Sequence, residues 1–315
     1  MTFESFAAWR ARAEKYFDRR DWWRLGPGAV LRSTLRLAVS RDTASGRQEG
    51  IDDRDPDFVD LACDLFEVVG ERYFRWEVHG VHHVPAKGAA LLVGSHNGGI
   101  ITIDSLLTIA AIRNQYGVER AVHPLAHDVL FQDERVRELS IRFGTLRAGQ
   151  AGAAAALQAG RLVLVYPGSD YDSTRPFRDR HRIELGGRTG FLELALRERV
   201  PIVPVVSVGT HEQLIVLTRG DRLAKLLGLK KLFRADVMPI ALALPWGISS
   251  GLLPYFPLPA QTTIAFGEPL SWPDLGPEHA KEPAVLARCY REVEQRLQRE
   301  LDDISRGRIP FLGRR

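Results

Sequence analysis

The sequence predicts an α/β fold in which a mixed, largely parallel sheet carries helices on both faces and follows a helical N-terminal segment. Two observations predict it: short apolar runs alternate with helical stretches along the middle of the chain, and a segment rich in aromatic and basic residues precedes them. Strands that alternate with helices form units whose connecting helices cover both faces of the sheet. With 315 residues, 45% of them hydrophobic and 26% charged, the chain is long enough for one main globular core.

Aromatic and basic residues are interleaved at the start of the chain. Phe3, Phe6 and Trp9, then Tyr16 and Phe17, fall at helical spacing among arginines. Short helices of this composition can lie in a lipid interface, and the alternative is that their aromatic side chains pack on the core. We expect residues 1–40 to contact an anionic membrane surface through four aromatic side chains: Trp9, Phe17, Trp22 and Trp23.

The other elements follow in order. Residues 41–57 are polar and predict an exposed linker, and residues 58–74 have the periodicity of a helix. Buried strands are predicted at five apolar runs: Ala89–Val93, Ala121–Leu125, Leu162–Tyr166, Ile202–Val208 and Thr262–Phe266. Helices are predicted at Gln150–Gly160 and Gly190–Arg199, and a charged amphipathic helix at Ala284–Ile304 is expected to cover the core. The chain thus divides into a helical N-terminal segment (1–75), a central domain (76–275), and a C-terminal helix and tail (276–315).

Composition excludes several classes of protein. The 43 basic and 39 acidic residues give a net charge of +4, which is too small to indicate nucleic-acid binding and is compatible with an anionic ligand or lipid. Cys63 and Cys289 have no metal-ligand spacing, which predicts reduced thiols in a cytosolic protein. The best apolar run, Met238–Trp246, is half the length that spans a bilayer, and the N-terminus lacks the apolar core of a signal peptide. We therefore expect a cytoplasmic protein, peripheral at the inner face of the membrane.

The most informative block is AALLVGSHNGGIITIDSLLTIA, residues 89–110. A β-compatible run ends at Gly94, and His96, a Gly-Gly pair and Asp104 follow. Sheets of this class bind ligands beyond the carboxyl ends of their strands, where such a turn would lie. A neutral His96 could take a proton from a hydroxyl group, and a carboxylate behind it would orient the imidazole and stabilise the imidazolium.

A second block, residues 161–212, is built in a similar way. A strand ends at Tyr166, Pro167-Gly168 turns the chain, and a loop with four acids and five arginines follows. A helix from about Gly190 then leads into the strand VPIVPVVSVG, which has prolines at its rim.

Together these residues resemble the phospholipid/glycerol acyltransferase family, whose members acylate lysophosphatidate, glycerol phosphate and related acceptors. The four sequence blocks of that family have counterparts here in the same order: His96 and Asp104, then Gly144 and Arg147, then Tyr166-Pro167-Gly168, and last Val200–Val205. The resemblance covers about residues 76–270. No single block is specific, whereas all four in order are.

Two departures from the family pattern bear on the acceptor. Seven residues separate His96 from Asp104 where the family usually has four, and Gly168 stands where the family has a glutamate. These departures make the chain similar to the branch that also resembles diacylglycerol acyltransferases. A neutral or bulky glycerolipid is then as plausible an acceptor as lysophosphatidate, and Asp170 could replace the missing acid.

The resemblance implies transfer of a fatty acyl group from acyl-CoA, or acyl carrier protein, to a hydroxyl group of a glycerolipid or lysophospholipid. His96 would be the general base and Asp104 its orienter, with no metal or tightly bound cofactor. Backbone amides around Asn97-Gly98-Gly99 would stabilise the oxyanion, because glycines let a main chain approach a substrate closely. Together with the Pro167-Gly168 turn, several arginines are candidates for binding a phosphate of the donor or acceptor: Arg147, Arg175, Arg178, Arg180 and Arg182. The alternative for this arginine-rich loop is a solvated cluster of ion pairs with its acids.

Three other patterns have simpler explanations. The run HPLAHD, residues 123–128, has the four-residue spacing but lies in an apolar strand without a glycine turn. GISSG, residues 247–251, resembles the serine-hydrolase elbow, but the LLPYFPLP that follows cannot start the helix that this motif requires. His79, His82 and His83 lack an acidic or cysteine partner at ligand spacing, so a surface turn is expected there.

A second class of function stays open, a non-catalytic lipid-binding or lipid-transfer protein on the same fold. The wide spacing between His96 and Asp104 favours it, as does Gly168, whereas the presence of both His96 and a downstream aspartate argues against it. A serine esterase would rest on GISSG alone.

Overall fold

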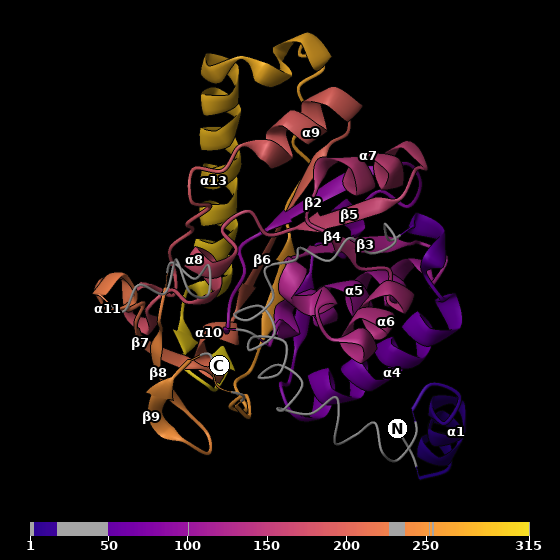
Figure 1. Cartoon of the computed structure of the whole chain (residues 1–315), viewed down its shortest axis with the longest axis vertical. Helices are drawn as coiled ribbons and strands as arrows, with labels where there is room; N and C mark the ends of the chain where they lie inside the picture. The colour runs from indigo at the N-terminus through magenta and orange to yellow at the C-terminus, as the bar shows by residue number, and fades with distance from the viewer. Residues whose placement is uncertain are drawn as a thin grey trace.

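A seven-stranded mixed sheet organises the chain (Figure 1). The computed structural model describes residues 3–17, 50–99, 101–226, 237–251, 253 and 255–314. From edge to edge the strands are β1 (Glu77–His79), β10 (Thr263–Phe266), β6 (Ile202–Val208), β2 (Ala90–Gly94), β5 (Leu162–Val165), β3 (Val122–Ala126) and β4 (Leu146–Arg147). Of the described pairings in this sheet, β10 with β6 is antiparallel and the others are parallel. The predicted mixed, largely parallel sheet is confirmed.

The central strands are apolar along their whole length because both of their faces are covered. In β2, Leu91 and Val93 point into one core and Ala90 and Leu92 into the other, as the alternation of a strand requires. Figure 1 shows α7 (Gln150–Gln158), α9 (Gly190–Glu198) and α13 (Pro283–Ser305) over one face, and α4 (Pro56–Arg72), α5 (Ile103–Tyr116) and α6 (Glu134–Arg142) on the other side. The five predicted strands agree with the observed ones to within one residue at each end.

The end of the predicted linker is wrong, because residues 50–57 are ordered against the domain. A 3₁₀ turn spans Ile51–Asp53, and Arg161 donates to the carbonyl of Ile51 and to Asp52. The side chain of Asp55 caps α4 by accepting from the amide of Phe58, so the helix begins at the proline that suits its first turn.

The first helix, α1 (Phe3–Ala13), packs on α4 instead of presenting its tryptophan to solvent. Trp9 is buried, and its indole nitrogen Nε1 donates to the carbonyl of Leu61 at 2.9 Å. Phe17 packs on Phe58 with ring centroids 6.2 Å apart. The expectation that Trp9 faces lipid is therefore wrong, Phe17 is half-buried, and Trp22 and Trp23 lie outside the described residues.

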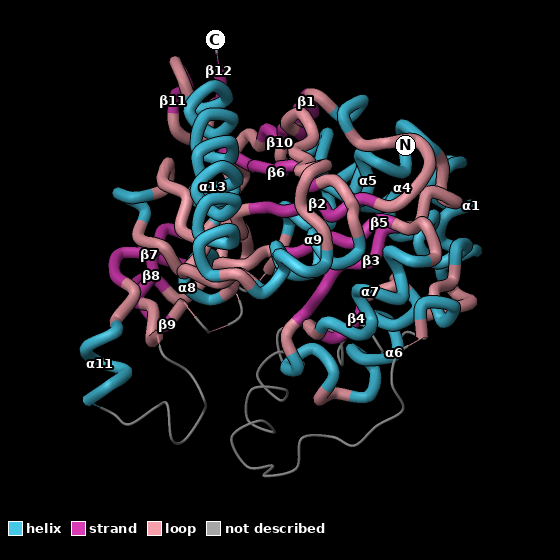
Figure 2. Tube along the Cα trace, turned by 90° about the horizontal axis from the view of Figure 1, so that it is seen from above, coloured by secondary structure: helices cyan, strands magenta, loops and turns pink. Residues whose placement is uncertain are grey.

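A second, three-stranded antiparallel sheet stands beside the main one, in the order β7 (Ile215–Thr218), β8 (Ile240–Ala243) and β9 (Gly247–Ser250) (Figure 2). This second sheet was not predicted from the sequence. After it the chain returns through β10 to α13, whose apolar side packs against β6 and β10. A short hairpin, β11 (Arg308–Ile309) and β12 (Gly313–Arg314), ends the described chain. Among the described helices, none has the length and apolar character needed to cross a membrane.

Candidate active site

His96 and Asp104 lie in direct contact at the carboxyl end of β2, with 3.0 Å between His96 Nδ1 and Asp104 Oδ2. The described residues between them form a turn and lead into α5, which begins at Ile103, so Asp104 lies in the first turn of that helix and points back to the imidazole. Asp104 Oδ2 also accepts from the amide of Asn97 at 2.9 Å, and Oδ1 accepts from the amide of Ser105 at 2.8 Å. The carboxylate is thus buried, and both of its oxygens accept hydrogen bonds.

Glycines make the turn after β2 possible. Gly98 and Gly99 have φ values of +86° and +80°, in the region that glycine adopts without strain. A Cβ at Gly98 would lie 2.7 Å from the carbonyl oxygen of Thr210, so the backbone here passes against the residues that follow β6. The Gly-Gly pair therefore allows the imidazole of His96 to turn toward Asp104 over a very short loop.

The environment of His96 shifts its basicity upward. Burial by itself lowers the pKa of this imidazole, but the contact with Asp104 and the nearby charge of Asp172 outweigh burial and raise the pKa above its ordinary value. The ring of Tyr166, the residue that ends the β5 run, lies beside it with centroids 4.6 Å apart. With the Nδ1 hydrogen donated to Asp104, the neutral imidazole keeps the lone pair of Nε2 for a substrate proton.

A second carboxylate, Asp172 in α8 (Asp170–Ser173), holds the same loop from the other side. Its Oδ2 accepts from the backbone amide of His96 at 2.6 Å, and its Oδ1 accepts from the hydroxyl of Ser95 at 3.1 Å. Burial raises the pKa of Asp172 above its usual range, although the adjacent Arg175 opposes that shift. The loop after β5 therefore fixes the backbone of the catalytic candidate.

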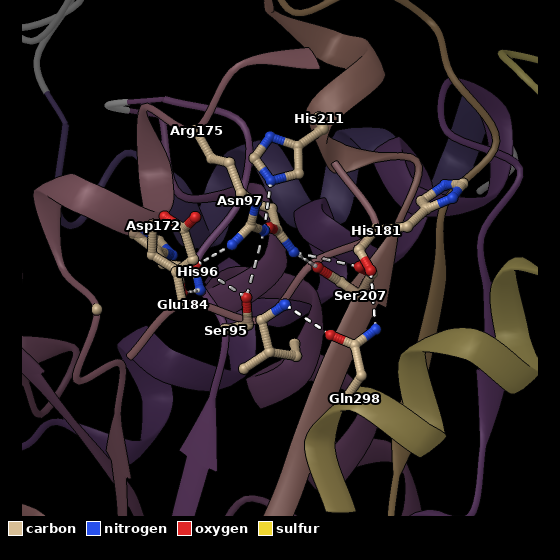
Figure 3. Close-up of polar contacts among 12 residues, drawn as sticks. Ser95, His96, Asn97, Asp172, Arg175, His181, Glu184, Ser207, His211 and Gln298 are labelled. Carbon is tan, nitrogen blue, oxygen red and sulfur yellow. Dashed lines mark hydrogen bonds and ion pairs between the residues drawn. The ribbon is translucent and has the colours of Figure 1, made fainter. Parts of the chain in front are cut away.

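Arg175 is fully buried and lies at the centre of a polar network (Figure 3). Its guanidinium donates to Asp172 Oδ1, to Asn97 Oδ1 at 2.7 Å and to His211 Nε2 at 2.8 Å. Burial and the charge of Arg175 lower the pKa of His211 far below its ordinary value, so His211 is neutral and accepts this hydrogen bond. The side-chain amide of Asn97 donates in turn to the carbonyl and hydroxyl oxygens of Ser207. The network joins the loops after β2, β5 and β6, three neighbouring strands.

The phosphate-binding role expected of Arg175 is therefore wrong: its charge is neutralised internally by Asp172. Arg178 is the opposite case, with a side chain that is 83% exposed and 3.4 Å from Asp179. Arg180 donates to the carbonyl of Phe177 and lies over its ring at 4.3 Å. The far end of the loop is held by Gln298 of α13, which donates to the carbonyl of His181 and accepts from the amide of Ile183, as Figure 3 shows.

Gly168 cannot be replaced by a larger residue in this backbone. A Cβ there would lie 2.4 Å from the carbonyl oxygen of Glu184 and 2.5 Å from the Cβ of Asp172. The carbonyls of Pro167 and Gly168 accept from Arg188 at 2.8 and 3.2 Å. The helix α8 begins at Asp170, and its Asp172 contacts the His96 loop.

Two of the three proposed oxyanion donors already have partners inside the protein. The amide of Asn97 donates to Asp104, and the amide of Gly99 donates to the carbonyl of Ser173 at 2.9 Å. Gly98 is the remaining candidate among them. Arg147 lies on β4, at the same carboxyl edge of the sheet and three strands from β2, where it pairs with Asp128 at 3.3 Å. The usual spacing of strands puts β4 about 14 Å from β2, a distance suited to a remote part of a long substrate.

The other histidine patterns belong to the framework. His123 is fully buried, its pKa is lowered by burial to about 4, and its ring nitrogen Nδ1 donates to the carbonyl of Gly144 at 2.9 Å. His83 donates to the carbonyl of Phe266 at 2.8 Å, and within the described ranges no group of three His, Cys, Asp or Glu side chains could hold a metal ion. GISSG forms hairpin strand β9 and its end, not a strand-to-helix elbow.

Sequence reasoning missed three residues of this network: Asp172, His211 and Ser207. Asp172 carried a recognisable signal, since it follows the β5 turn in the stretch SDYDSTR together with Arg175. His211 and Ser207 carried none, because they come from a strand end far along the chain.

Comparison with known proteins agrees with the sequence blocks. Residues 75–208 match the family model described as "Acyltransferase". An "uncharacterized protein" of Mycobacterium tuberculosis is 33% identical over 236 residues, which are 75% of this chain and 63% of that protein. The chain therefore spans less than two thirds of the length of this relative. A protein of Mus musculus called "DGAT1/2-independent enzyme synthesizing storage lipids" is 30% identical over 185 residues, 58% of this chain and 54% of that one.

A solved structure shares the fold. The 1-acyl-sn-glycerophosphate (LPA) acyltransferase PlsC from Thermotoga maritima aligns with a TM-score of 0.50 and 14% identity over 89% of this chain and 88% of that one.

Proposed function

We propose that this chain is an O-acyltransferase that moves a fatty acyl group to a hydroxyl group of a glycerolipid or lysophospholipid, because residues 75–208 match the acyltransferase family model. The donor is acyl-CoA or acyl carrier protein. The observation that supports the proposal most is the 3.0 Å contact between His96 Nδ1 and Asp104 Oδ2, inside the matched residues and at the edge of the sheet where such folds bind ligands.

In the proposed reaction His96 acts as the general base. Its Nε2 takes the proton of the acceptor hydroxyl while the hydroxyl oxygen attacks the carbonyl carbon of the thioester. The tetrahedral intermediate then collapses, the carbon–sulfur bond breaks, and the proton passes from Nε2 to the departing thiolate. Asp104 stabilises the imidazolium that exists between these two proton transfers. The amide of Gly98 is assigned to the oxyanion.

The arginines outside the core are assigned to the anionic part of a substrate. Arg178 is exposed on the loop after β5, and Arg180 and Arg147 flank the same edge of the sheet. A guanidinium group matches phosphate oxygens, so these side chains, with the turn at Pro167-Gly168 and Asp170, form the proposed substrate-binding face. The name of the storage-lipid enzyme supports a neutral glycerolipid as the acceptor. In this proposal the protein reaches such an acceptor from the cytoplasm, by binding the inner membrane surface.

Acyl transfer can be measured with purified protein, radiolabelled acyl-CoA and a panel of lysophospholipids, monoacylglycerols and diacylglycerols. His96→Ala is expected to lower turnover by about 100-fold or more, the effect of losing a positioned base. His79→Ala, an exposed histidine on β1, is the matched control and is expected to leave turnover unchanged. Transfer that survives in His96→Ala would remove the catalytic assignment.

A non-catalytic lipid-binding or lipid-transfer protein is the second candidate. Gly168 favours it, because no acidic side chain fits at this position. Lipid extraction or transfer by a parent protein that shows no acyl transfer to any acceptor would select this alternative.

A further inference from the structure

The small sheet carries an unusual concentration of exposed apolar side chains. Of the ten large hydrophobic side chains that are exposed among the described residues, six belong to β7, β8, β9 and the segments beside them: Leu217, Leu242, Leu244, Trp246, Ile248 and Phe256. Single exposed hydrophobics are normal on a protein surface, whereas a contiguous group indicates a binding surface. We call these six side chains the apolar face of the small sheet.

The strand register makes this face continuous. Ile215, Leu242 and Ile248 are direct partners across the three strands, so their side chains form one row on the same side of the sheet. Leu244 bridges Phe256, which extends the row past the end of β8. The alternate residues, such as Val216 and Ala241, are buried on the opposite side. The register therefore places four of the six exposed side chains on one side of the sheet: Leu242, Leu244, Ile248 and Phe256.

The buried side of the same sheet is fastened to the candidate active site. Tyr255 donates its hydroxyl hydrogen to the carbonyl of Gly98 and accepts from the amide of Ile101 at 3.2 Å. A Cβ at Gly99 would lie 2.5 Å from Leu214 Cδ2, so the small sheet rests directly on the loop that follows His96. Whatever binds the apolar face is held next to that loop.

Basic side chains border the apolar face. The 3₁₀ turn Phe177–Asp179, which carries the exposed Arg178, lies against β7. Arg219, directly after β7, is largely buried and pairs with Glu184, so it holds the arginine-rich loop beside the small sheet and adds no uncompensated charge. The side chain of Lys225 in α11 (Asp221–Leu226), the helix that follows β7, is exposed. An apolar surface with a basic border complements a bilayer that has anionic headgroups.

We propose that the apolar face of the small sheet binds an anionic lipid bilayer and thereby brings the His96 loop to the membrane surface. The proposal rests on the proposed function, because a lipid substrate gives the site a reason to lie there. It places the lipid contact away from the first helix, which packs its tryptophan on α4 and lies across the molecule from β7, β8 and β9 in Figures 1 and 2.

Vesicle flotation of the full chain tests this directly, with phosphatidylcholine vesicles that contain or lack phosphatidylglycerol. Ile248→Thr keeps a β-branched residue in the strand and removes the most exposed side chain of the face. Leu312→Thr is the matched control, because Ile248 and Leu312 are 72% and 70% exposed. The double variant Leu242→Thr with Ile248→Thr is expected to bind anionic vesicles about tenfold more weakly or worse, since burial of each such side chain favours binding. Leu312→Thr is expected to bind like the parent.

Several outcomes would overturn the proposal. One is a parent chain that does not float, and another is a double variant that floats like the parent. A third is a dimer of the parent in sedimentation that the double variant does not form, because the apolar face would then be a contact between two copies of the chain. A separate assay uses a water-soluble short-chain acyl-CoA and an acceptor dissolved as single molecules, so that no bilayer is needed. It distinguishes failure of the membrane-binding proposal from failure of the proposed acyltransferase function. There the double variant is expected to match the parent while His96→Ala is inactive. If the parent is inactive with every acceptor yet floats, the acyltransferase proposal fails and the lipid-binding face stands.

Discussion

Replacing Arg175 by methionine is predicted to destabilise the fold severely, although the two side chains have similar length. Arg175 is completely buried, and its guanidinium is the charge partner of Asp172 as well as the donor to Asn97 and His211. Breaking a buried ion pair from one side leaves the other charge uncompensated, which lowers the free energy of unfolding by about 3 to 5 kcal/mol. The two acceptors left without a donor add to this, at about 1 to 3 kcal/mol each if water does not reach them.

The sum approaches the whole free energy of unfolding of a typical domain, about 5 to 15 kcal/mol. We therefore expect Arg175→Met to lose at least about 3 kcal/mol, measured by urea denaturation followed by circular dichroism. The control is Arg178→Met on the same loop, whose exposed side chain is expected to change stability by less than about 0.5 kcal/mol.

A second variant tests the cause. Adding Asp172→Leu to Arg175→Met removes the unpaired charge, so part of the lost stability is expected to return. The recovery stays incomplete because the amide of His96 and the hydroxyl of Ser95 lose their acceptor. An Arg175→Met protein within about 1 kcal/mol of the parent, or a double variant less stable than the single one, would refute this reasoning.

Three further predictions concern His96, Gly168 and Trp9. Activity is expected to rise with pH through a midpoint above 6.5, because only neutral His96 accepts a proton and its pKa is raised. In a pH profile the variant Asp104→Asn should move that midpoint down, and an unmoved midpoint would contradict the pairing of His96 with Asp104. Gly168→Ala is expected to lower stability by about 1 to 3 kcal/mol in thermal unfolding, because the new methyl group meets Glu184 and Asp172, and an unchanged melting temperature would show that the loop relaxes freely. Trp9→Ala is expected to lower the free energy of unfolding by about 3 kcal/mol, because the side chain loses its packing on Leu61. A variant with unaltered stability and weakened vesicle binding would show that the N-terminal segment contacts the lipid.

The sequence identified the candidate catalytic pair because its signal is local. His96 follows a buried strand and a glycine turn, and Asp104 lies eight positions later, so both residues occur in one short window. The direct contact between them could not be read from spacing alone, since seven intervening residues fit many paths. Positive φ values at Gly98 and Gly99 select the path that brings Nδ1 to 3.0 Å from the carboxylate.

The arginine-rich loop shows the opposite case. Arg175 and Arg178 are three residues apart and look alike in the sequence, yet one is fully buried beside Asp172 and the other is 83% exposed. Their difference arises because the loop after β5 folds over the loops after β2 and β6, and no local pattern encodes that packing. The partners of Arg175 on those other loops, Asn97 and His211, are 78 and 36 residues away from it in the chain.

Apolar periodicity predicted five strands of the main sheet and the helices α4, α7, α9 and α13, because a side chain's access to water alternates with the period of its own element. The binding partner of the amphipathic start of the chain was ambiguous for the same reason. An apolar stripe predicts that a helix face is buried, but it does not identify the surface that buries it. Only the tertiary structure decided that Trp9 packs on α4, that Arg175 neutralises Asp172, and that one side of β7, β8 and β9 stays exposed. These outcomes depend on which segments meet in space, and strand order and loop packing set that through contacts between residues far apart in the chain.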